Sequence, residues 1–68
     1  MFVIVLTLSA DFLATLRALA LELPQVYIDT DRVQELQLRP EVTEAEARRI
    51  AEAYEASERY DKIEVVRR

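Results

Sequence analysis

The spacing of the apolar positions changes along the chain, and these changes divide it into predicted strands and helices. Residues 2–8 form a run rich in β-branched and aromatic side chains, apolar at odd and even positions alike. Such a run is typical of a central strand covered on both faces. Because side chains alternate along a strand, one parity faces the helices and the other, with Val3 and Val5, faces the opposite side of the sheet.

A helical spacing follows this strand. Between residues 10 and 23 an apolar stripe recurs every three or four positions, which predicts a helix. Ser9 is suited to cap its start, and Pro24 ends it because proline disfavours helical geometry in the residue before it. Leu13 and Leu21 lie off the stripe, where they either widen the core face or contact a second chain. The stripe consists of Phe12, Leu16, Leu19 and Leu23.

Two short strands are predicted next. Val26–Ile28 is a three-residue strand, followed by turn-forming residues at 29–32 whose aspartates can accept hydrogen bonds from their own backbone. Val33–Arg39 then alternates between apolar and polar residues, which predicts a third strand. Val33 itself is out of phase with the alternation, so either a bulge intervenes or this residue belongs to the turn.

The clearest local signal marks the second helix. Thr43 is the expected N-cap, Glu46 is its capping-box partner, and Val42 is placed to pack against Ala47 across the cap. The alternating segment Ile63–Arg67 predicts a last strand.

One parity of each strand and one stripe of each helix are continuously apolar, so these side chains are expected to form a single core. The expected core comprises Phe2, Ile4, Leu6, Leu8, Phe12, Leu16, Leu19, Leu23, Val26, Ile28, Leu36, Leu38, Ile50, Tyr54, Ile63 and Val65.

The predicted order is β-α-β-β-α-β over a single α+β domain, residues 1–68. With right-handed crossovers this order resembles the ferredoxin-like fold, a split β-α-β sandwich. The resemblance implies a four-stranded antiparallel sheet in the order 4-1-3-2 with two helices on one face. It is one of element order and length, and many functions share this topology, so the fold alone assigns none of them.

The composition excludes several kinds of site. The chain has no Cys, no His and no Gly, which removes thiolate chemistry, the commonest general base and every glycine-dependent phosphate loop. Asp29 and Asp31 are spaced like the start of a calcium loop, but the twelfth position is Pro40 and the required glycine is missing. We therefore expect no catalytic, cofactor-binding or metal-binding residues, no cofactor, no small-molecule ligand and no enzymatic activity.

The charge balance and the start of the chain indicate a soluble protein. Nine Lys and Arg face thirteen Asp and Glu, a net charge of −4, which argues against nucleic acid or an anionic membrane as a partner. The apolar run at the start is only about eight residues long, too short for a secretory signal or a membrane span. The expected location is the cytoplasm, or recombinant expression only if the protein is designed.

Local signals agree with the overall pattern nearly everywhere, and Gly, Cys, His, Trp and Asn are all absent. In these respects the chain resembles de novo designed proteins of the ferredoxin-like class, although Arg far outnumbers Lys, as a GC-rich natural gene would also produce. The resemblance implies a structural scaffold with no evolved catalytic or binding activity. The alternative is a small natural interaction module that self-associates or docks a larger partner through its open sheet face.

The open sheet face is the expected contact surface. Its apolar centre and charged rim suggest a homodimer formed by packing two such faces together, although the valines could also serve strand propensity alone. The residues assigned to this interface are Val3, Val5, Tyr27 and Val66, with Leu13 or Leu21 at a second contact.

Overall fold

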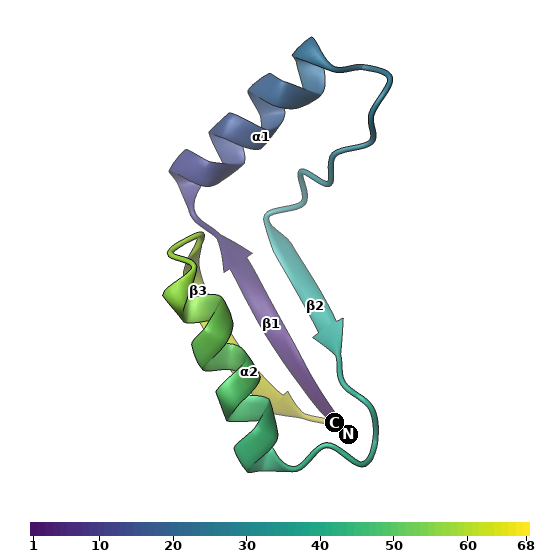
Figure 1. Ribbon diagram of the computed structural model, residues 1–68, viewed down its shortest axis with the longest axis vertical. Coiled ribbons are helices and arrows are strands. Elements are labelled where there is room, and N and C mark those ends of the chain that lie inside the picture. Colours follow the sequence, from purple (N-terminus) through teal and green to yellow (C-terminus); the bar gives the residue numbers. More distant parts are fainter.

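A three-stranded sheet with one helix packed across it forms the centre of the computed structural model, which describes residues 1–68 (Figure 1). Its strand order is β2-β1-β3, and β1 is antiparallel to both neighbours. Since β2 and β3 are therefore parallel to each other and α2 joins them, this part of the chain is a split β-α-β unit with β1 in the gap. The elements are β1 (Phe2–Leu8), α1 (Ala10–Glu22), β2 (Val33–Gln37), α2 (Glu44–Ala56) and β3 (Tyr60–Arg67).

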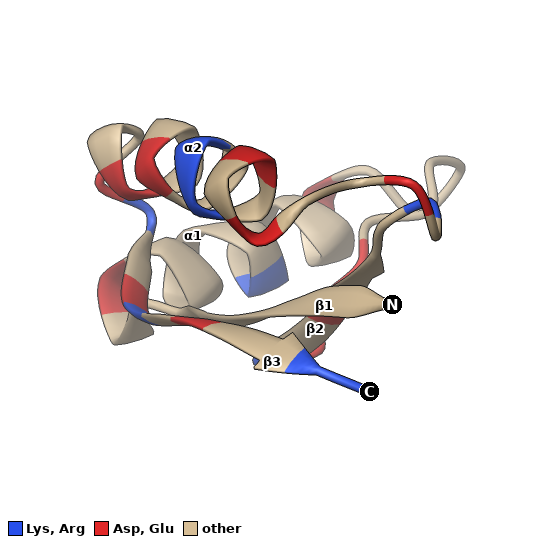
Figure 2. Ribbon diagram, turned by 90° about the horizontal axis from the view of Figure 1, so that it is seen from below, with Lys and Arg blue, Asp and Glu red and all other residues tan.

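The predicted four-stranded sheet of order 4-1-3-2 is wrong. Residues 26–28 form no strand, and the helix before them does not cross the sheet, so α2 alone covers one sheet face (Figures 1 and 2). The local cause lies directly after α1, where the backbone N–H of Val26 donates to the carbonyl of Leu23 at 3.0 Å. This turn occupies a donor that a strand would need for its ladder, and too few residues remain for stable pairing.

The prediction that β1 is a central strand is confirmed. Val3 and Ile4 point to opposite faces of the sheet, and both are fully buried. Ile4 lies opposite Leu36 of β2 and Val65 of β3, so the inward parity predicted for these three strands is correct.

The register of β2 removes the ambiguity at Val33. This residue lies opposite Thr7 in an uninterrupted ladder, so it belongs to the strand, points away from α2, and needs no bulge. The irregularity occurs instead in β3, where Thr7 pairs with Lys62 and Leu8 pairs with Tyr60, so Asp61 is left without a partner.

Both predicted helix caps are confirmed. The Ser9 hydroxyl accepts from the backbone N–H of Phe12 at 3.2 Å, and the Thr43 hydroxyl accepts from that of Glu46 at 3.2 Å. Thr43 also donates to the Glu46 carboxylate at 3.1 Å, which ties the two side chains of the capping box together. These contacts satisfy N–H groups that have no partner inside the helix.

The core is smaller than predicted. Leu19, Leu23 and Val26 were assigned to it, yet all three are exposed. The reason is that α1 continues past the end of the sheet and packs closely on no other element (Figure 1). The buried residues are Val3, Ile4, Leu6, Leu8, Leu13 and Ala47.

The projecting helix gives the molecule an elongated shape. Its principal extents are 40, 21 and 16 Å, with α1 and the returning chain at one end of the long axis (Figure 1). Neither 13-residue helix has the length and apolar character needed to span a membrane.

Candidate interaction surfaces

The sheet face opposite α2 carries the valines predicted to form a dimer contact. Val5 of β1 lies between Glu35 of β2 and Glu64 of β3, and Val3 lies beside Val66. The two flanking carboxylates make the middle of this face more charged than the valines alone suggest.

An ion pair spans this face from one edge of the sheet to the other. Arg68, directly after β3, donates to both carboxylate oxygens of Glu35 in β2, at 2.6 and 3.1 Å. Arg68 is aligned with Met1 and Glu35 with Val5, so the pair passes over Val3, which is fully buried. The hydrogen bonds and charge of Arg68 lower the pKa of Glu35, and Glu35 raises that of Arg68 in return.

A second ion pair lies on the same face. Lys62 contacts Glu64 at 2.6 Å, and this hydrogen bond and charge raise the pKa of Lys62. Both carboxylates beside Val5 are thus neutralised within the chain. Val5 and Val66 are half-buried on this face, and Val33 of β2 is 56% exposed on it.

Most of the exposed large apolar side chains lie elsewhere, on α1 and the chain that follows it. Leu19 and Leu23 are 38% and 39% exposed and lie on one helix stripe with half-buried Leu16. We call these three residues the α1 surface. Leu21 is 85% exposed but lies on the opposite side of the helix, two residues and about 200° from Leu19.

The remaining residues assigned to the predicted interface are separated from one another. Tyr27 is 89% exposed on the chain returning from α1, outside the sheet, and therefore does not lie on the sheet face where it was expected. Leu13, in contrast, is buried within the chain.

The base of α1 contacts the turn that leads into β3. The backbone N–H of Ser9 donates to the carbonyl of Arg59 at 2.9 Å, and the Arg59 guanidinium lies 5.4 Å from the centre of the Phe12 ring. The returning chain is tied to β1 where the N–H of Leu8 donates to the carbonyl of Arg32 at 2.8 Å.

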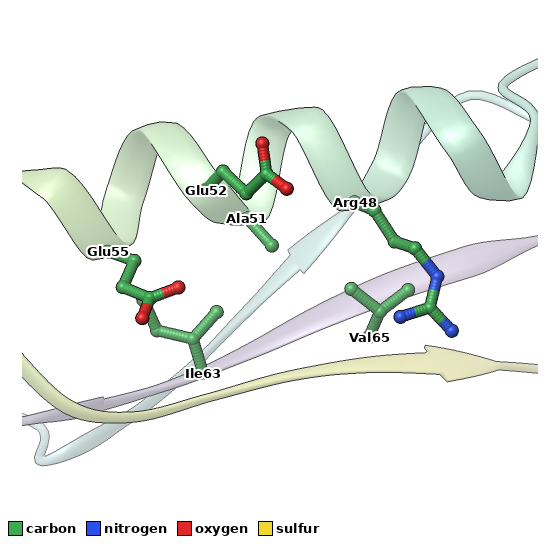
Figure 3. Close-up of a pocket in the computed structure, with 6 residues that line it drawn as sticks. All are labelled: Arg48, Ala51, Glu52, Glu55, Ile63 and Val65. Carbon is green, nitrogen blue, oxygen red and sulfur yellow. The ribbon is translucent and has the colours of Figure 1, made fainter.

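A shallow hollow of about 290 Å³ lies between α2 and β3 (Figure 3). Ile63 and Val65 point from the strand toward the helix and form its apolar side. Of its charged residues, Arg48 is already paired with Glu44 at 2.9 Å. Its other charged residues are the carboxylates Glu52 and Glu55, which lie on the α2 side of the hollow. Its lining residues are Arg48, Ala51, Glu52, Glu55, Ile63 and Val65.

A second hollow, of about 260 Å³, lies at the end of α2 and includes Tyr54, Arg59 and Tyr60. The two tyrosine rings pack edge to face, with centroids 5.9 Å apart and planes at 75°. This geometry is that of a packing contact between helix and strand.

The aspartates after α1 form the turn predicted for them. The Asp29 carboxylate accepts from the backbone N–H of Asp31 at 2.9 Å. No group of three or more carboxylates is close enough together to hold a metal ion.

The sequence reasoning missed both the Glu35–Arg68 pair and the α1 surface. The charges are 33 residues apart, and only the strand register shows that they share a face. The stripe of α1 was recognised but assigned to the core.

Comparisons with protein-family models, curated proteins and solved structures find no match for this chain.

Proposed function

We propose that this protein is a small, non-enzymatic interaction module that self-associates, and that the α1 surface forms the contact. The main support is the large solvent-accessible surface of the single chain. Its accessible area is 5150 Å², whereas a folded monomer of this mass exposes about 4,400 Å².

The excess corresponds to one side of an ordinary protein interface. It amounts to roughly 750 Å², and a standard interface buries about 800 Å² per partner. The radius of gyration, 13.7 Å against about 11 Å for a compact chain of this length, agrees with this excess. A second copy of the chain could bury this excess exposed area.

The protein is then an interaction module and not a scaffold without a binding role. A scaffold alone gives no reason for an anchored apolar helix to project from the sheet. The homodimer through the open sheet face remains a prediction, but Val3 is buried there and two ion pairs occupy the face. No ion pair crosses the α1 surface, whose three residues are all leucines.

Sedimentation equilibrium at high micromolar concentration tests the proposal. The parent chain should sediment with the mass of two chains, and Leu19→Lys should return it to the mass of one. Leu21→Lys is the matched control, because it makes the same substitution two residues away on the other side of α1 and should leave the dimer intact. A one-chain mass for the parent protein at this concentration refutes the proposed function.

A further inference from the structure

We infer that α1 of each protomer packs across β2 of a second copy, on the same sheet face as α2 and beside it. This inference rests on the proposed self-association and specifies where its contact lies. The site is formed by the residues on the α2 side of β2, Gln34 and Leu36, and by Leu38, which directly follows the strand and continues its pairing with β1.

The α2 side of the sheet is unevenly covered. The helix packs on β3 and β1, where Ile4 and Leu6 are almost completely buried. No residue of β2 is fully buried, and Leu36 and Leu38 are each only half-buried. An apolar strip therefore remains beside α2 at the β2 edge.

The dimensions of α1 suit this strip. Its 13 residues span about 20 Å. The five residues of β2 span about 17 Å. A helix laid along the strand would place Leu16, Leu19 and Leu23, which are spaced over two turns, against Leu36 and Leu38.

The helix of the same chain is held away from this strip. Ser9 donates to the carbonyl of Arg59, and the Arg59 guanidinium lies over the Phe12 ring, so the base of α1 is bound to the turn before β3, on the other side of β1 from β2. A second copy can contribute its helix without disturbing either contact. Each copy carries one projecting helix and one uncovered strip, so a two-fold arrangement satisfies both at once and closes on itself.

Two glutamines of β2 give a matched test, because they lie three residues apart on opposite sheet faces. Gln34 is opposite Leu6 on the α2 side, and Gln37 is opposite Val3 on the open face. Gln34→Lys places a charge under the docked helix and should raise the dimer dissociation constant about tenfold or more. Gln37→Lys should change it less than about twofold.

The opposite result separates this inference from the proposed function. If Gln37→Lys disrupts the dimer and Gln34→Lys does not, the chains associate through the open sheet face and the α1 docking is wrong, although self-association stands. Circular dichroism of both variants establishes that each is folded.

Disulfide trapping provides a second measurement, since the chain has no cysteine of its own. Leu19→Cys and Leu36→Cys are made in separate chains, one isotopically labelled, then mixed and oxidised. The yield of disulfide dimers that join one labelled and one unlabelled chain is measured by intact mass. It should be about tenfold or more higher than in the control, in which Leu21→Cys replaces Leu19→Cys. Equal yields overturn the inference. So does a disulfide formed within one chain at high dilution when both cysteines are in the same molecule, because it shows that α1 folds back on its own sheet.

Discussion

The two helices have the same length but opposite relations to the sheet. α1 is the more apolar, yet only Leu13 of it is buried and much of its stripe is exposed. α2 is strongly charged on its outer side, yet it lies across the sheet with Ala47 completely buried. The apolar content of a helix therefore does not decide how well it is covered within its own chain.

The difference follows from the connections. α2 joins two parallel strands that lie on either side of β1, so its chain must cross the sheet. α1 leads from β1 to its antiparallel neighbour, β2, a connection that requires no crossing. A turn after Leu23 and a segment without regular structure return the chain to Arg32. Nothing in this path forces α1 onto the sheet.

A matched pair of leucine truncations tests this contrast with the largest expected effect. Leu6→Ala, at a side chain 4% exposed beneath α2, should reduce the free energy of unfolding by about 2–5 kcal/mol. Leu19→Ala, at a side chain 38% exposed, should reduce it by less than about 1.5 kcal/mol. Urea titrations at low protein concentration, where association does not contribute, measure both. Equal losses would mean that α1 is packed within the chain as tightly as β1.

The two N-caps sharpen the comparison at a smaller scale. Thr43→Ala should lower the free energy of unfolding by about 0.5–2 kcal/mol, because α2 is packed against the sheet. Ser9→Ala removes an equivalent hydrogen bond, but it should chiefly increase amide exchange within α1 and move the urea midpoint less. The contrast between the helices is wrong if Ser9→Ala shifts the midpoint as far as Thr43→Ala.

Local signals predicted the parts of the fold that depend on a few neighbouring residues. Ser9 and Thr43 cap their helices as expected, and the alternation in β1 places Ile4 and Val3 on the faces assigned to them. What failed is the pairing of residues 26–28 with the rest of the sheet. These residues have the composition of a strand and the outer edge of β2 is free, but the turn after α1 uses the N–H of Val26.

The same limit applies to the candidate surfaces. The apolar stripe containing Leu19 is visible in the sequence, but whether a stripe meets its own sheet or another chain depends on the path of the connection after it. Glu35 and Arg68 likewise show no relation until the register of β2 and β3 is known.

A substitution at one strained backbone position should stabilise the part of the chain formed by the sheet and α2. Glu58, in the turn between α2 and β3, has φ of 58°, the left-handed region that non-glycine residues occupy at a cost. Glu58→Gly should raise the free energy of unfolding by up to about 1 kcal/mol. Ser57→Gly is the control, since φ of −71° gives glycine no advantage and its hydroxyl bond to Tyr54 is lost. A lower urea midpoint for Glu58→Gly would contradict the prediction.

The smallest expected effect is the pH dependence of stability that comes from the ion pair on the open sheet face. Arg68 lowers the pKa of Glu35 in the folded chain, so the pair contributes stability above the ordinary carboxyl pKa and loses it as the pH falls through the lowered value. Parent and Glu35→Gln should therefore differ at neutral pH and converge in acid, with the difference reduced by salt because the pair is exposed. Glu41→Gln removes the same charge from a carboxylate in no ion pair and serves as the control. Urea midpoints between pH 2 and 7 follow both variants, and a gap between parent and Glu35→Gln that widens in acid would contradict the assigned role of the pair.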